Sequence, residues 1–101
     1  MKFNRFSYQV ESVVTFTVAE AEQLIEHVGS TGATSEEVAL VARLRLGLRF
    51  STREGVEIRL SRQELSVILV FEDRIGPLAE PLHQVLSENI SEANKLNLGL
   101  K

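Results

Sequence analysis

A chain of 101 residues, 44% of them apolar and 25% charged, is long enough for one compact domain and too apolar for a disordered segment. Its formal net charge of −3 is too small to favour nucleic acid, membranes or any other class of partner. The absence of cysteine excludes disulfides, thiolate chemistry and cysteine-ligated metal centres.

The chain carries no recognisable targeting or membrane segment. Its N-terminal part has no continuous apolar stretch of the kind found in signal peptides, and the longest strongly apolar run, Val67–Phe71, is far too short to span a bilayer. We therefore expect one soluble, cytoplasmic domain over residues 1–101, without a membrane partner. The last residues, about 97–101, are expected to fray.

A strand is predicted from Ser7 to Thr17, where β-branched and aromatic residues dominate. Its apolar and polar side chains alternate, with an interruption at Ser12, as they do in a strand that is buried on one face. The alternation places Tyr8, Val10, Val14 and Phe16 on an inward face, and Gln9, Glu11, Val13 and Thr15 on the opposite one.

A first helix is predicted immediately after this strand. Thr17 and Glu20 have the spacing of a capping box, in which each side chain accepts a hydrogen bond from the other residue's backbone N–H. Apolar residues then continue at helical spacing as far as Gly29, where a helix commonly ends.

A second helix is predicted from about Ser35 to Arg45, because Thr34 and Glu37 repeat the capping-box spacing. The preceding segment, GSTGATS (residues 29–35), is similar to a phosphate-binding loop only in its glycines. It follows a helix and contains no lysine, so we expect a plain connection between two helices.

A hairpin is predicted around Gly55, which lies between two alternating segments. Basic and apolar residues alternate in RLRLGLRF (residues 43–50), where Arg43 and Arg45 are expected to close the second helix and the first strand of the hairpin is expected to begin near Leu46. A three-residue loop, Arg53–Gly55, would pair Phe50 with Ile58 and Leu48 with Leu60 on one inward face. It would also place Arg49 opposite Arg59 on the outward face.

A third helix is predicted from about Arg62 to Arg74, beginning with a capping box between Ser61 and Glu64. Val67–Phe71 is β-branched and aromatic, so a strand remains an alternative there. Gly76 and Pro77 interrupt the chain, and Pro81 fits near the start of a last helix.

The predicted order of elements is β-α-α-β-β-α-α. This order favours an α+β fold with a small antiparallel sheet of about three strands and helices packed on one face. The opposite face of such a sheet can remain open and serve as a dimer surface. The inward side chains are predicted to be Tyr8, Val10, Val14, Phe16, Leu48, Phe50, Ile58 and Leu60.

No enzymatic motif is recognisable in the sequence. His27 and His83 are far apart in the sequence, and a metal site would need further ligands such as Glu26 or Glu80 to converge with them. Glu20, Glu22 and Glu26 are interpreted as a helix cap and a solvated helix face. We therefore predict a protein that is not an enzyme, with no catalytic residue, no cofactor and no metal ion.

Arginine is concentrated in one part of the chain. Six arginines and two glutamates lie between residues 43 and 62, a local charge of +4, whereas the rest of the chain carries −7. Arginine suits bidentate contacts with carboxylates or phosphates, so these residues are the candidate interaction site. The six are Arg43, Arg45, Arg49, Arg53, Arg59 and Arg62.

Three sources could supply the anion that neutralises Arg49 and Arg59: Glu11 or Glu57 of the same chain, an acidic face of an identical subunit, or a phosphate. We expect a small protein-interaction or regulatory module that forms a homodimer or higher oligomer, or binds another protein. A nucleic-acid-associated regulatory protein is the alternative. The absence of lysine from the arginine-rich segment and the overall acidity count against it.

Overall fold

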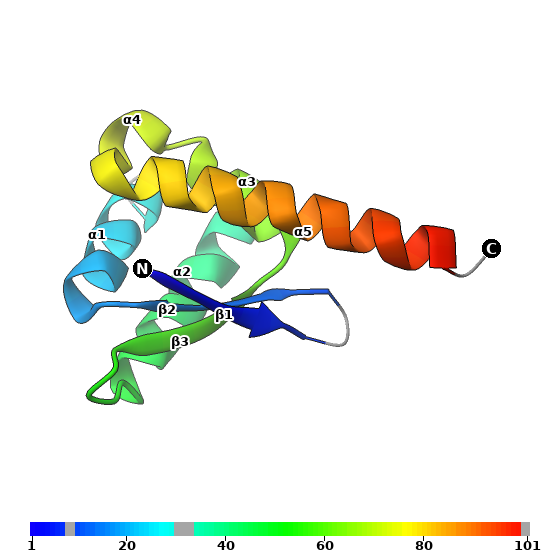
Figure 1. Cartoon of the computed structure of the whole chain (residues 1–101). Helices are drawn as coiled ribbons and strands as arrows, with labels where there is room; N and C mark the ends of the chain where they lie inside the picture. The colour runs from blue at the N-terminus through cyan, green and yellow to red at the C-terminus, as the bar shows by residue number, and fades with distance from the viewer. Residues whose placement is uncertain (8–9, 30–33, 100–101) are drawn as a thin grey trace.

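The computed structural model describes residues 1–7, 10–29 and 34–99 (Figure 1). The elements follow in this order: β1 (Lys2–Phe6), β2 (Ser12–Phe16), α1 (Val18–Gly29), α2 (Ser35–Arg49), β3 (Val56–Leu60), α3 (Arg62–Leu69), α4 (Glu72–Ile75), the 3-10 turn η1 (Gly76–Leu78) and α5 (Ala79–Gly99). The described strands form one antiparallel sheet in the order β1-β2-β3. The predicted α+β class is confirmed, although the order of elements begins β-β-α-α-β.

The inward face of the sheet and the helices share one hydrophobic core. β2 is the central strand, and its register with β3 sets Val14 opposite Ile58 and Phe16 opposite Val56. These four residues and side chains from α1, α2, α3 and α5 are buried in one cluster. The four helices therefore cover one face of the sheet (Figure 1). The inward side chains that were predicted correctly are Val14, Phe16, Ile58 and Leu60.

The predicted strand from Ser7 to Thr17 is wrong in its first half. The backbone turns there, because Ser7 accepts a hydrogen bond from the Val10 N–H at 3.0 Å and donates one to the Glu11 carbonyl at 2.8 Å. Val10 has a φ of 61°, so its side chain does not continue the alternation of β2, which begins at Ser12. Tyr8 and Gln9 lie outside the described residues.

Strand β1 was not predicted, and a β-bulge explains why. Phe3 pairs with Val14 and Phe6 pairs with Ser12, and the register shifts between Phe3 and Arg5. An extra residue in one strand changes the side-chain alternation. The two phenylalanines are three positions apart in the sequence, yet both lie against inward residues of β2, and their ring centroids are 5.0 Å apart.

The predicted hairpin between residues 46–50 and 56–60 is wrong, because α2 continues to Arg49. Leu44 is buried and Leu48 is half-buried, so these two face the core at helical spacing. Leu46 and Phe50 point outward, with 54% and 76% of their surface exposed. Extending an existing helix is far easier than starting a new element, so the helix that begins at Ser35 runs through the alternating segment.

Gly55 lies at a tight turn, as the sequence predicts. Thr52 and Gly55 exchange two backbone hydrogen bonds, of 2.9 and 3.1 Å, and form an isolated bridge. The φ of Gly55 is 120°, and a Cβ atom there would lie 2.2 Å from the Phe16 carbonyl oxygen. Only glycine fits this position. The turn pairs Thr52 with Gly55 and is not continued by a hairpin, because the chain before it is helical.

The three predicted capping boxes are all present. In each, a hydroxyl accepts a hydrogen bond from the glutamate N–H three residues later, and the glutamate carboxylate accepts one from the N–H of the capping residue. The pairs are Thr17 with Glu20, Thr34 with Glu37, and Ser61 with Glu64. Each fixes the start of a helix that follows a strand or a loop.

The predicted third helix is divided in two. α3 ends at Leu69, and the short helix α4 follows over Glu72–Ile75, so Val67–Phe71 is not a strand. Val70 is exposed, whereas Phe71 turns into the core. None of the described helices combines the length and the apolar composition needed to cross a membrane.

Helix α5 is the longest element, with 21 residues. Its Leu82 and Val85 join the core, and its buried Asn89 reaches the connection between β1 and β2. The Asn89 side-chain amide donates hydrogen bonds to the Val10 carbonyl at 2.8 Å and to the Ser12 hydroxyl at 3.0 Å. The helix runs through Gly99, into the segment that was expected to fray.

Candidate interaction surface

Helix α2 is held against the rest of the molecule by one side. Leu40, Val41 and Leu44 are buried in the core. Near its C-terminal end, a Cβ atom on Gly47 would lie only 2.8 Å from a methyl carbon of the buried Val56. The absence of a side chain at Gly47 therefore lets α2 lie directly on β3, and this contact fixes which side of α2 faces outward.

The outward side of α2 is unusually apolar for a solvent-exposed helix face. Val38 and Leu46 have 57% and 54% of their surface exposed, and Phe50 follows at the helix end with 76%. Residues four positions apart lie on one side of a helix, so these side chains and Ala42 form a stripe. We call this surface the α2 outer face. It consists of eight exposed residues: Ser35, Val38, Ala39, Ala42, Arg45, Leu46, Arg49 and Phe50.

The charge of the α2 outer face is entirely positive. Arg45 and Arg49 lie on it beside the apolar stripe, and none of its eight residues is acidic. The acidic residues of this helix, Glu36 and Glu37, are in its first turn. The helix is therefore acidic at its N-terminal end and basic toward its C-terminal end, as the helix dipole favours.

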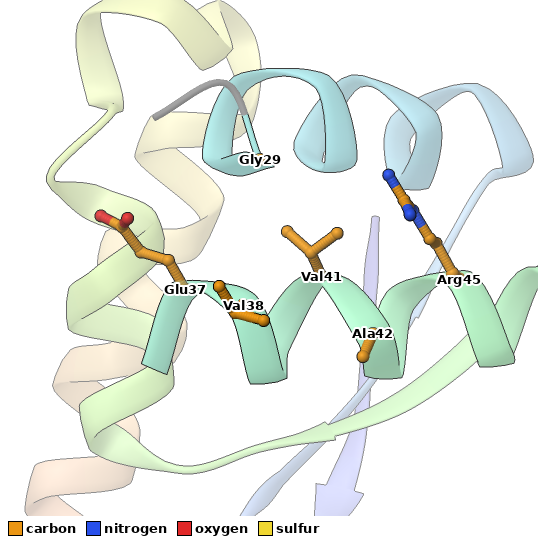
Figure 2. Close-up of a pocket in the computed structure, with 6 residues that line it drawn as sticks. All are labelled: Gly29, Glu37, Val38, Val41, Ala42 and Arg45. Carbon is orange, nitrogen blue, oxygen red and sulfur yellow. The ribbon is translucent and has the colours of Figure 1, made fainter. Parts of the chain in front are cut away.

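A pocket of about 200 Å³ lies between the end of α1 and this helix, at the border of the α2 outer face. Figure 2 shows Val41 and Arg45 pointing toward α1, whereas Ala42 points away from it. The pocket is lined by Gly29, Glu37, Val38, Val41, Ala42 and Arg45. It has an acidic and a basic side chain near opposite ends of an apolar floor. Residues 30–33, where the sequence suggests a glycine-containing connection, lie outside the described residues.

The six arginines predicted as one site are distributed over different surfaces. Arg45 and Arg49 lie on the α2 outer face, Arg53 lies in the turn before β3, and Arg62 is the first residue of α3. The predicted pairing of Arg49 with Arg59 is wrong, since Arg59 lies opposite Val13 of β2. Of the six arginines, Arg45 and Arg49 therefore share one exposed helix face, and the other four lie elsewhere.

Arg43 has a structural role. Its guanidinium donates hydrogen bonds to the Glu64 carboxylate and to the Arg59 carbonyl, and it thereby connects α2 with α3 and with the end of β3. Glu64 also takes part in the capping box at the start of α3. The Arg43 guanidinium therefore binds groups of the same chain and stabilises the packing of α2 against α3.

The outward face of the sheet is a second charged surface. Arg5 and Arg59 lie on either side of Val13 in the sheet register, and only 1% of the Val13 surface is exposed. The aliphatic parts of long arginine side chains can cover an apolar residue in this way while their charged ends remain in water. Arg5 forms an exposed ion pair of 3.6 Å with Glu57, which was a predicted internal partner for the arginines.

The titratable residues weighed as catalytic or metal-binding candidates lie apart. Among the described residues, no three histidine or acidic side chains gather where they could hold a metal ion. His83 approaches the Glu72 carboxylate at 2.6 Å on the exposed surface. Glu20 completes its capping box, and Glu22 and Glu26 are exposed on α1.

Comparison with known protein families, with curated proteins and with solved structures gives no match.

The sequence placed Arg45 on the same predicted helix as Val38, but it placed Leu46 and Arg49 on a strand and so did not bring them onto that helix face. The spacing of four between Val38, Ala42 and Leu46 is visible in the sequence. Residues 46–50 were predicted as a strand instead, in which Phe50 would have been buried.

Proposed function

We propose that this protein is a small, non-enzymatic protein-interaction module that binds its partner through the α2 outer face. The observation that carries this proposal is the combination of Val38, Leu46 and Phe50, each more than half exposed, on one helix face. Apolar side chains scattered singly over a surface need no explanation, but several on one face are typical of a binding surface.

The chemistry of the face indicates the kind of partner that fits it. An apolar surface rimmed by charge complements a partner that presents apolar side chains flanked by carboxylates. Arg45 and Arg49 can each contact a carboxylate through two parallel hydrogen bonds, which adds orientation to the apolar contact. The surrounding charge would mainly select the partner and set its orientation, while burial of Leu46 and Phe50 would supply the affinity.

The alternative of nucleic-acid binding has less support. Phosphate recognition needs several cations along one surface, whereas the predicted arginines are divided among α2, the turn before β3, the outward sheet face and α3. Leu46 lies between Arg45 and Arg49, and its exposed aliphatic side chain cannot contribute to the electrostatic attraction of a phosphate backbone.

Site-specific photo-crosslinking in the cells that naturally make the protein tests this proposal. A photoreactive amino acid is introduced at Leu46 and, as a matched control, at the exposed Ser87 of α5. We expect a discrete protein adduct from position 46 and none above background from position 87. Equal yields at the two positions, or no adduct at position 46, would overturn the proposed function.

A further inference from the structure

We infer that the partner of the α2 outer face is a second copy of this chain, with the two α2 helices packed antiparallel about a two-fold axis near Ala42. This inference rests on the proposed function and adds the identity of the partner. It is argued from the apolar pattern of the face, from the small side chains at its centre, and from the charge of helix α2 as a whole, which is acidic in the first turn and basic toward the C-terminal end.

The apolar pattern is symmetric about Ala42. In a two-fold interface, a residue on one side of the axis contacts the residue at the same distance on the other side in the second copy. Val38 and Leu46 lie four positions before and after Ala42, and both are exposed. Antiparallel packing therefore places Val38 of each copy against Leu46 of the other.

The centre of the face is formed by small side chains. Ala42 lies on the proposed axis, and Ala39 lies one turn before it. Because the distance between packed helices depends on the side chains at the contact, alanines permit an approach near the short end of the usual range, roughly 8 Å. At that distance the larger Val38 and Leu46 side chains can interdigitate on either side.

The charge distribution favours the antiparallel arrangement. The first turn of α2 carries Glu36 and Glu37, and its C-terminal half carries Arg45 and Arg49. Antiparallel packing brings the basic half of each helix alongside the acidic turn of the other. A parallel arrangement would bring arginine beside arginine, which is unfavourable without an intervening anion.

The expected dimer is reversible. A single pair of 15-residue helices forms an interface below the roughly 1,200 Å² of standard stable complexes. The fraction of dimer should therefore rise with protein concentration. The position of the arginines within the interface should also make the dimer sensitive to salt.

Disulfide trapping tests the position of the axis directly, because the chain contains no cysteine of its own. In Ala42→Cys, the two introduced thiols would face each other across the axis. In Ala39→Cys, they would be displaced along the helices by roughly 9 Å, too far for a disulfide. Ser87→Cys on α5 measures random collisions.

Under mild oxidation, we expect Ala42→Cys to form disulfide-linked dimer at least about tenfold faster than Ala39→Cys or Ser87→Cys. Equal rates for the three variants would overturn the inference, as would faster trapping of Ala39→Cys. All three substitutions are at exposed positions, and retention of the fold is checked by circular dichroism.

Charge reversal gives a second, independent measurement. The double variant Arg45→Glu/Arg49→Glu places negative charge beside the acidic first turn of the other copy, where the two repel each other. We expect its dimer dissociation constant, measured by sedimentation, to increase at least about tenfold. Arg53→Glu/Arg62→Glu makes the same change in net charge outside the face and should leave the constant unchanged. Equal effects of the two double variants would contradict the antiparallel contact.

The identity of the photo-crosslinked adduct distinguishes the two proposals. An adduct with twice the chain mass of 11.3 kDa supports self-association. An adduct between Leu46 and a different protein, together with a strictly monomeric protein in sedimentation, would overturn the second-copy inference and leave the proposed function standing. The absence of any adduct would overturn both.

Discussion

Glu20 shows how a single carboxylate connects separate parts of the chain. It accepts hydrogen bonds from the Met1 ammonium group at 2.8 and 2.9 Å and from the Thr17 N–H at 2.8 Å. Burial raises the pKa of Glu20, but the ammonium group and the Thr17 donors outweigh it, so the pKa lies below its usual 4.5. The carboxylate thus ties the start of β1 to the start of α1.

The lowered pKa has a consequence for stability. A carboxyl group with a lower pKa in the folded state stabilises the fold fully above its unfolded pKa, and this contribution is lost as pH falls through the folded value. We expect Glu20→Gln to lose about 1 kcal/mol of unfolding free energy at pH 7, since the remaining amide oxygen can still cap Thr17. At about pH 2.5, below the usual glutamate pKa, wild type and variant should differ much less.

Urea unfolding at the two pH values measures this difference, with Glu22→Gln on the exposed side of α1 as the control. The control should have little effect at either pH. A loss in Glu20→Gln that is equally large at acidic and neutral pH would show that the charge of Glu20 is not its source.

At the scale of elements, the starts of α1, α2 and α3 were predictable and strand pairing was not. A capping box is formed by residues three positions apart, so Thr34 and Glu37 carry all the information needed to locate the start of α2. Strand pairing depends on contacts between distant residues. β3 pairs with β2 by setting Ile58 opposite Val14, 44 positions earlier, whereas the sequence suggested a nearer partner.

Residues 43–50 illustrate why alternation alone could not decide between strand and helix. RLRLGLRF has a period of two, and its Leu44 and Leu48 also continue the helical spacing that begins at Leu40. The segment continues the helix that begins at Ser35, and Gly47 allows that helix to pack directly against Val56, a contact between elements that the local pattern does not contain. Arg49 was consequently placed on a strand, whereas Arg43 and Arg45 were correctly placed on the second helix.

Two neighbouring leucines test the helical assignment of this segment. Leu48 is half-buried against the core, whereas Leu46 is exposed on the opposite side of α2. We expect Leu48→Ala to cost about 1 to 2 kcal/mol of unfolding free energy and Leu46→Ala to cost little, when both are measured at concentrations where the chain is monomeric. In the predicted hairpin both leucines would face the core, so equal losses would contradict the helix.

For the whole molecule, the arrangement of charge matters more than the net charge of −3. The local excess of arginine is divided among α2, the turn before β3, the outward face of the sheet and the start of α3. On the outward face of the sheet, Arg59 lies near Arg5, which is paired with Glu57. The chain therefore lacks a single continuous basic surface within its described part. This division is the reason for expecting protein recognition in preference to phosphate recognition.

We accordingly expect no measurable binding to random duplex DNA at about 50 mM salt, where electrostatic binding to phosphates is strong. Fluorescence anisotropy of a labelled duplex, followed during a salt titration, provides the measurement. Binding that weakens steeply with salt, and that Arg45→Glu/Arg49→Glu abolishes, would instead support the nucleic-acid alternative.

The hydrogen bond from Asn89 to the Val10 carbonyl spans 79 positions of the sequence and bears on the order in which the chain folds. Val10 holds a left-handed φ of 61°, which is unfavourable for a β-branched residue unless its surroundings impose it. Two strands of five residues form only a marginal hairpin on their own. The hydrogen bond that supports Val10 comes from the C-terminal helix, so we expect this support to form during synthesis only after nearly all of this sequence has left the ribosome.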